Sequence, residues 1–247
     1  MEITIRRDGL TLRGVLEGTD QLENERVAVL FHGFQGNRGT HPGKLLYDLS
    51  HELNRRSLAT LRFDFAGCGE SDGTFDQMTV LGELLDAMAI LDFVRTKVKA
   101  KQVLVAGHSQ GGVVAAMVAA AYRDLVDRLL LLAPAVSLKS DALKGECQGT
   151  SYDPNHVPLT VPVNGIAVGG QYFRSAQLLP ILETAAHYPG PALVMQGDAD
   201  QVVSPKEAKE LAAALPQGKL ELLAGEDHSL EVDVAPVLER ATGFLLG

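Results

Sequence analysis

The sequence lacks three features that would each point to a special class of protein. Its two cysteines, Cys68 and Cys147, are too few for a disulfide scaffold, and no CxxC or Cys/His cluster indicates a zinc site. Basic residues number 22 against 31 acidic ones, and this negative balance disfavours binding to nucleic acid or to an anionic membrane. The longest apolar stretch, residues 113–122, is far shorter than the ~20 residues needed to cross a bilayer.

The remaining composition is that of an ordinary globular protein. Of the 247 residues, 46% are hydrophobic and 21% are charged, and a chain of this length buries roughly three quarters of its unfolded surface. The first residues, MEITIRRDGLTLRG, alternate polar and apolar side chains, so no signal peptide is expected. We expect a cytoplasmic protein whose oligomeric state is open, a homodimer included.

Short apolar runs alternate with segments of helical periodicity along most of the chain. Residues 3–16 predict an antiparallel hairpin that turns at Asp8-Gly9. Runs typical of strands buried on both faces follow at 27–31, 59–63, 103–106, 129–133, 192–195 and 220–223. Crossover helices are expected at 44–54, 80–94, 111–122, 175–186 and 205–215, and a final helix at 235–246. This pattern predicts an α/β fold, with a mostly parallel eight-stranded sheet and helices on both faces.

One glycine- and proline-rich segment interrupts the alternation. Residues 135–170 contain no long periodic stretch, and a loop of this length inside a compact domain is usually functional, for example as a lid. We therefore predict a single domain over residues 1–247, with a cap inserted at about 135–175 after the sixth strand.

Two segments match the pattern G-x-S-x-G, which places a nucleophilic serine on a tight turn between a strand and a helix. The first, residues 69–73 around Ser71, lies in a polar loop that starts no helix. The second, residues 107–111 around Ser109, follows a buried strand and leads into an apolar helix. Context therefore favours Ser109 as the nucleophile and makes Ser71 a loop residue.

A nucleophilic serine needs a base and a group that orients the base, and in this fold the chain order is Ser, Asp or Glu, then His. His228 is the histidine that follows the last predicted strand. After the strand at 192–195, Asp198 and Asp200 are both candidates for the acid. We favour Asp200 because it lies deeper in the loop, and expect Asp198 to stabilise the turn and Asp227 to be solvated.

The loop HGFQGN directly follows the strand at 27–31, where this fold supplies one N–H of the oxyanion hole. We expect this donor to be the N–H of Phe34, and the second to be that of Gln110, the residue after the nucleophile. Each donor can stabilise a developing oxyanion by roughly 3 kcal/mol. His32 is expected to brace the loop by hydrogen bonds, and His108 to be a packing residue.

These motifs together resemble the α/β-hydrolase superfamily, through HGFQGN, RFDFAGCGES, GHSQGG, GDADQVV and Asp227-His228. The inserted segment is similar to that of bacterial cinnamoyl (feruloyl) esterases, through residues 132–135, 141–143, 148–149, 152–154 and 169–172. This resemblance implies that Asp141 and Tyr172 bind the phenolic hydroxyl of the substrate ring and that Gln148 is a further cap contact. The sequence departs from the family after His228, where residues 229–231 lack an aromatic side chain.

The function implied is that of a serine carboxylesterase, which hydrolyses feruloyl, caffeoyl and p-coumaroyl esters, chlorogenate included, through an acyl-enzyme. Neither a metal nor an organic cofactor is expected. A general short-chain acyl esterase, a monoacylglycerol lipase or a peptide hydrolase are alternatives within the same chemistry. A ligand-binding protein on the same fold is an alternative of another class. For Asp141 and Tyr172, the structural alternatives are capping of a turn and packing of the lid.

Overall fold

The computed structural model describes residues 1–18 and 26–247, and within these ranges eight strands form one large sheet in the order β1-β2-β4-β3-β5-β6-β11-β12. β1 pairs antiparallel with β2, and β2 with β4, whereas the other neighbours are parallel. The strands are β1 (Glu2–Arg7), β2 (Leu10–Glu17), β3 (Arg26–Phe31), β4 (Ala59–Phe63), β5 (Gln102–His108), β6 (Val126–Leu132), β11 (Pro191–Gly197) and β12 (Gln217–Leu223). The predicted mostly parallel sheet is confirmed.

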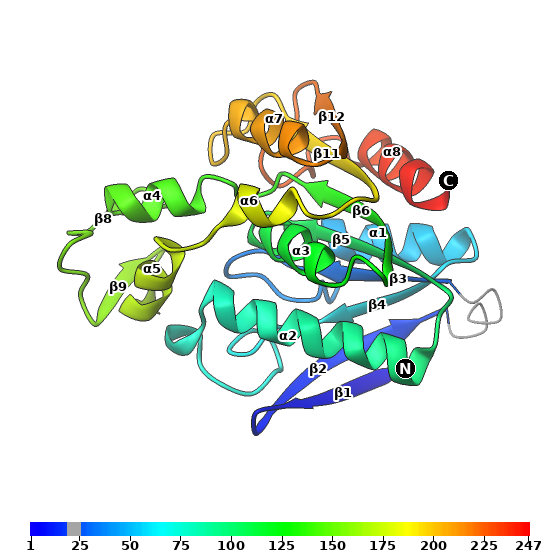
Figure 1. Cartoon of the computed structure of the whole chain (residues 1–247), viewed down its shortest axis with the longest axis horizontal. Helices are drawn as coiled ribbons and strands as arrows, with labels where there is room; N and C mark the ends of the chain where they lie inside the picture. Colours follow the sequence, from blue (N-terminus) through cyan, green and yellow to red (C-terminus); the bar gives the residue numbers. More distant parts are fainter. Residues whose placement is uncertain (19–25) are drawn as a thin grey trace.

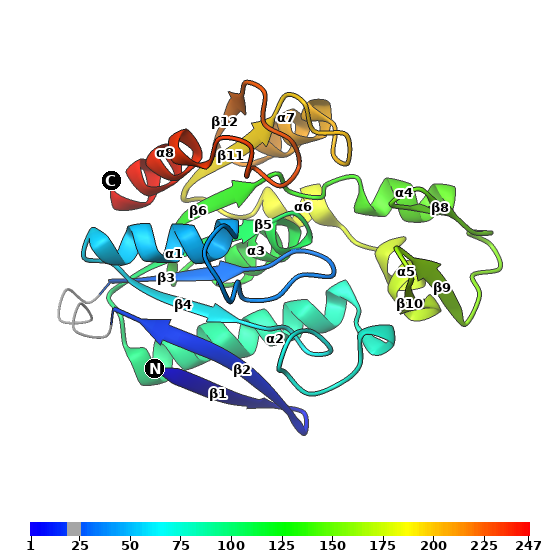
Figure 2. The same ribbon diagram turned by 180° about the vertical axis from the view of Figure 1, so that it is seen from behind.

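Helices cover both faces of this sheet, because alternate side chains of its strands point to opposite sides. In β3, Val27, Val29 and Phe31 join a core with α2 and α3, whereas Ala28 and Leu30 join a second core with α1 and α8. Figure 1 shows α2 and α3 in front of the sheet, and Figure 2, from behind, shows α1. The helices are α1 (Leu45–Arg55), α2 (Val80–Phe93), α3 (Gln110–Ala121), α6 (Ile181–Ala185), α7 (Pro205–Ala214) and α8 (Val234–Leu246).

The turn between β1 and β2 follows from its sequence. Asp8 and Gly9 have φ values of 50° and 86°, and two successive residues with positive φ are typical of the tight hairpin turn that Asp-Gly favours. None of the helices in residues 1–18 and 26–247 has the length and apolar character of a membrane-spanning segment.

The segment between β6 and α6 projects beyond the carboxyl ends of the parallel strands, on the left of Figure 1. We call residues 135–176 of this segment the cap. Within the described ranges, its two short hairpins pair only with themselves and not with the large sheet. The cap consists of α4 (Leu138–Lys144), β7 (Glu146–Cys147), β8 (Thr150–Ser151), β9 (Thr160–Val163), β10 (Ile166–Gly169) and α5 (Gly170–Ala176).

The helix predicted over residues 175–186 is wrong. The chain instead forms α5, which ends at Ala176, and α6, which begins at Ile181. Pro180 lies between them at the N-cap of α6. Because proline has no N–H to donate and its ring clashes with the preceding turn, a continuous helix through this position is unfavourable.

Candidate active site

Ser109 lies at a sharp turn between β5 and α3, with φ 54° and ψ −122°. A non-glycine residue in such a conformation costs on the order of 1–3 kcal/mol, so its surroundings must hold it. Its N–H donates to the carbonyl of Leu132 at 2.9 Å, and its own carbonyl accepts from Ala135 at 3.0 Å. A Cβ on Gly107 would lie 2.1 Å from the carbonyl oxygen of Gly111, so the turn closes only with glycine at position 107.

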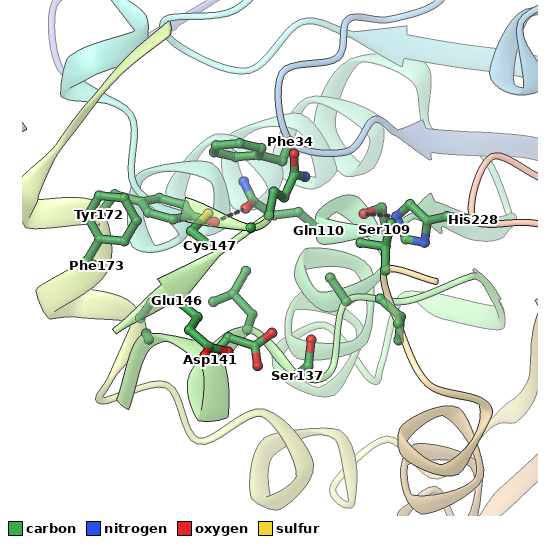
Figure 3. A pocket seen from close by; sticks show the side chains of 18 of the residues that line it. Phe34, Ser109, Gln110, Ser137, Asp141, Glu146, Cys147, Tyr172, Phe173 and His228 are labelled. Carbon is green, nitrogen blue, oxygen red and sulfur yellow. Dashed lines mark hydrogen bonds between the residues drawn. The ribbon is translucent and has the colours of Figure 1, made fainter. Parts of the chain in front are cut away.

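The three residues predicted for nucleophile, base and acid meet at the carboxyl edge of the sheet. His228, in the loop after β12, has its Nε2 2.8 Å from Ser109 Oγ, as Figure 3 shows. Its Nδ1 lies 2.8 Å from Oδ2 of Asp200, which is in the loop after β11. This geometry allows the imidazole to take a proton from the serine while the carboxylate fixes the ring.

The Asp200 carboxylate is fully buried yet well supplied with donors. Its Oδ1 accepts the backbone N–H groups of Val202 at 2.7 Å and Val203 at 2.9 Å. Burial by itself would raise the pKa of Asp200, but the hydrogen bonds from His228 and from these N–H groups bring it below its ordinary value. Asp200 is therefore ionised at neutral pH and can stabilise a protonated imidazole.

The other residues considered for this chemistry are engaged elsewhere. Asp198 accepts the N–H of Gly225 at 2.8 Å, a contact with the loop after β12 and not within its own turn. Asp227 accepts the N–H of Ser229 at 2.8 Å. The hydroxyl of Ser71 is buried in the loop after β4, where it donates to the carbonyl of Asp64 at 2.6 Å.

The backbone of the HGFQGN loop lies directly against Ser109. A Cβ on Gly33 would be 2.9 Å from the Cβ of Ser109. Phe34 from this loop and Gln110, the first residue of α3, line the same cavity as Ser109 and His228. Both residues predicted to donate to the oxyanion thus line the cavity that holds the serine, and Gln110 lies at the positive end of a helix dipole.

His32 braces this loop, as its position in the sequence predicts. The N–H of Phe65 donates to His32 Nε2 at 3.1 Å, so the ring proton is on Nδ1, which donates to the carbonyl of Gly33 at 2.9 Å. Burial lowers the pKa of His32, which keeps the ring neutral in this role.

His108 does more than the packing expected from the sequence. Its Nε2 lies 2.8 Å from the carbonyl oxygen of His228, and because a carbonyl can only accept, Nε2 carries the proton. Burial lowers the pKa of His108 to about 4, so the ring stays neutral near pH 7. No sequence signal reveals this contact, since the two residues are 120 positions apart.

A cavity of about 610 Å³ extends from Ser109 and His228 to the cap. Asp141, Gln148 and Tyr172, the three predicted substrate-binding residues, all line it. Figure 3 shows Asp141 and Tyr172 on the cap side, away from the serine. Within residues 1–18 and 26–247, no three acidic, histidine or cysteine side chains are grouped to hold a metal ion.

The cap residues differ in how firmly they are held. Tyr172 is buried and its hydroxyl donates to Oε1 of Gln110 at 2.7 Å. Asp141 is partly exposed and lies 3.4 Å from the ammonium of Lys144. Gln148 is exposed and its Oε1 accepts from the amide of Asn164.

The side chain of Gln110 is also bound from the opposite side, by a residue that the sequence analysis missed. Its Nε2 donates to Oε2 of Glu83 at 2.8 Å, and Glu83 is buried on α2. Burial raises the pKa of Glu83 to about 8, and the nearby Asp86 adds to the rise while the Gln110 hydrogen bond opposes it. The amide of Gln110 thus connects α2 with the cap.

The chain is similar to known proteins in sequence and in fold. Residues 23–150 match the family model described as Serine aminopeptidase, S33 (Hydrolase_4). The uncharacterized protein YfhR from Salmonella typhi is 25% identical over 228 residues, which are 90% of this chain and 72% of that protein.

Two solved structures of Est1E from Butyrivibrio proteoclasticus are similar over nearly the whole chain. The one with bound ferulic acid has a TM-score of 0.91 at 28% identity and covers 99% of this chain and 98% of its own. The other has a TM-score of 0.87 at 26% identity and covers 99% and 97%. Because the family model spans more than half of the sequence, the chain belongs to the Serine aminopeptidase, S33 (Hydrolase_4) family, and it is a hydrolase with the α/β-hydrolase fold.

Proposed function

We propose that this hydrolase is a serine carboxylesterase that cleaves hydroxycinnamate esters through an acyl-enzyme. The observation that carries the proposal is the hydrogen-bonded series Ser109–His228–Asp200, which opens into a cavity with polar groups at its far end. The end of the cavity at Ser109 holds the groups that ester cleavage requires. The end at the cap has the apolar wall and polar groups that can bind a flat phenolic acyl group.

Acylation begins when Ser109 Oγ attacks the ester carbonyl and His228 Nε2 takes the hydroxyl proton. Asp200 holds the imidazole with Nδ1 protonated and stabilises the positive charge that forms. The N–H groups of Phe34 and Gln110 donate to the oxyanion of the tetrahedral intermediate. When this intermediate collapses, the alcohol leaves with the proton from His228.

Deacylation repeats these steps with water as the nucleophile. His228 removes a proton from the water, which attacks the acyl carbonyl, and the same two N–H groups stabilise the second oxyanion. Collapse returns the proton to Ser109 Oγ and releases the free acid. No step requires a group from outside the chain other than the ester and water.

The acyl end of the cavity supports the aromatic substrate class. The Tyr172 ring lies 5.4 Å from that of Phe34, and both side chains line the cavity, so its wall holds two neighbouring aromatic rings. Asp141 can accept a hydrogen bond from a phenol, and the Tyr172 oxygen keeps a lone pair to accept one although its proton goes to Gln110. The resemblance to Est1E, whose structure holds ferulic acid, supports the same class.

Replacement of the nucleophile tests the reaction. We expect Ser109→Ala to abolish turnover of methyl ferulate and of p-nitrophenyl butyrate without unfolding the protein, and to abolish labelling by a fluorophosphonate probe. Ser71→Ala is the control and should keep wild-type turnover. Retained turnover in Ser109→Ala would exclude the mechanism.

Replacement of the cap residues tests the substrate class. We expect Asp141→Ala and Tyr172→Phe each to lower kcat/KM for methyl ferulate about tenfold, the equivalent of one hydrogen bond, and to leave butyrate hydrolysis nearly unchanged. Equal losses on the two esters would refute phenol binding and would favour a general short-chain acyl esterase.

A further inference from the structure

Gln196 contacts the acid of the proposed triad, although neither the sequence motifs nor the mechanism above uses it. It lies near the carboxyl end of β11 and is fully buried. Its Nε2 is 2.6 Å from Asp200 Oδ2, the same oxygen that faces His228 Nδ1. The same nitrogen is 3.3 Å from the carbonyl oxygen of Val203.

The surroundings of Gln196 fix the orientation of its amide. The groups near one end of the amide are a carboxylate and backbone carbonyls, which can only accept, so the NH2 group must face them. Its Oε1 then points to a buried site where it has no hydrogen-bond partner among the described residues. A buried carbonyl without a protein partner is unfavourable, so the contacts that favour glutamine at this position are those of its NH2 group, of which the one to Asp200 is the shortest.

We propose that Gln196 is a positioning residue that fixes the carboxylate of Asp200 for His228. The backbone N–H groups of Val202 and Val203 hold Oδ1, and Gln196 holds Oδ2. With both oxygens held, the carboxylate cannot rotate away from the imidazole. This inference rests on the proposed function, because it assigns Gln196 a part in the same proton transfer.

Gln196 also affects the charge that Asp200 presents to the imidazole. A donor on Oδ2 takes up part of the negative charge, so its removal leaves more charge to stabilise protonated His228. The acidic limb of the pH–rate profile, which reports protonation of His228, should then move to higher pH. The other titratable groups that interact with Asp200 are His108 on β5 and Asp227 after β12, and the substitution leaves both in place.

The test is Gln196→Met, which keeps the length of the side chain and removes the donor. We expect kcat for p-nitrophenyl butyrate to fall about tenfold, the order of effect that hydrogen bonds to metal-binding side chains have at metal centres. KM should be unchanged because Gln196 does not line the cavity. The acidic limb should move to higher pH. The melting temperature should stay equal or rise, because a buried polar group without full partners is gone.

Gln217→Met is the matched control. Gln217 begins β12, at the opposite end of the sheet from Asp200, and its amide donates to the carbonyl of Pro189 at 2.6 Å. The same substitution there should change neither kcat nor the pH profile. Folded Gln196→Met protein with wild-type kcat and pH profile would overturn the role of Gln196.

Gln196→Glu gives a second, independent test that keeps the shape of the side chain. Its carboxyl group can donate to Asp200 only while it is protonated, so we expect activity to decline at alkaline pH, where the wild type does not. Activity that does not decline at alkaline pH, as in the wild type, would refute the proposal. Activity that persists in Ser109→Ala would instead refute the proposed function, so the two failures are distinguishable.

Discussion

The carboxyl edge of the large sheet and the cap hold their polar side chains in different ways. At the edge, the Asp200 carboxylate is buried and receives hydrogen bonds from two backbone N–H groups, one imidazole and one amide. In the cap, Tyr172 is buried and bonded to Gln110, but Asp141 is partly exposed with one lysine nearby and Gln148 is exposed. The firmly held groups at the sheet edge suit the proton transfers that hydrolysis of any ester requires. The more exposed groups of the cap can adjust to different acyl chains.

The largest effect should come from the acid at the sheet edge. Asp200→Asn places an amide where His228 needs an acceptor, so the imidazole adopts the wrong tautomer and kcat should fall about 10⁴-fold. The loss should be equal for methyl ferulate and p-nitrophenyl butyrate. Asp198→Asn, in the same loop, should keep wild-type kcat, and a greater loss there than at Asp200 would contradict the assignment.

A smaller effect should follow from moving the loop that carries Phe34. Gly33→Ala introduces a Cβ 2.9 Å from that of Ser109, so the loop must shift and its N–H loses alignment with the oxyanion. We expect kcat to fall roughly 100-fold on both esters, in line with loss of one oxyanion donor. The control, Gly243→Ala in α8, meets no atom within 4 Å and should raise the free energy of unfolding by about 0.5–1 kcal/mol.

Glu83, on α2 beside the Gln110 amide, should make stability depend on pH. Its pKa is about 8 in the folded protein and returns to its ordinary value near 4.5 on unfolding, so the unfolded state loses the proton first. The free energy of unfolding therefore falls as pH rises between these values. The free energy of unfolding of Glu83→Gln should rise relative to that of the wild type by on the order of 3 kcal/mol from pH 5 to pH 8, measured by urea unfolding.

An exposed glutamate provides the control for this experiment. Glu210→Gln on α7 should change stability equally at both pH values, since its carboxylate is exposed in the folded protein. If Glu83→Gln changed the free energy of unfolding by the same amount at pH 5 and pH 8, burial would not perturb the ionisation of Glu83.

The smallest effect is expected on the surface of the cap. The Leu159 side chain is 88% exposed, so Leu159→Ser should change the free energy of unfolding by less than about 0.5 kcal/mol. Thermal unfolding and esterase assays should both match wild type. A marked loss of stability would mean that the cap is held as firmly as the sheet edge, and the contrast between the two regions would fail.

The sequence predicted the sheet edge better than the cap, for a physical reason. Parallel strands end at one edge, so residues that follow them, such as Ser109, Asp200 and His228, must lie near one another whatever the loops do. The cap has no such constraint. Its helix α4 is too short for a clear period. Just after the cap, Pro180 at the N-cap of α6 lies where apolar spacing alone predicts one helix over residues 175–186.

Contacts around the site were less predictable than the site itself. His108 meets the carbonyl of His228, and Gln110 meets Glu83, through pairings of residues far apart in sequence. The sequence around each of these side chains is equally compatible with a role in ordinary packing. Only the assembled sheet decides which distant polar group it meets, so no motif identifies it in advance.

The separateness of the cap hairpins has a consequence for protein engineering. Because β7–β8 and β9–β10 share no ladder with the large sheet in the described residues, the chain leaves the hydrolytic body after β6 and returns to it at α6 without crossing a strand pair. A chimaera that carries another esterase's cap between these junctions would keep every backbone pairing of the sheet. The cap can then be exchanged as a unit to change the substrate range, while the reactive serine and its hydrogen-bond partners keep their positions.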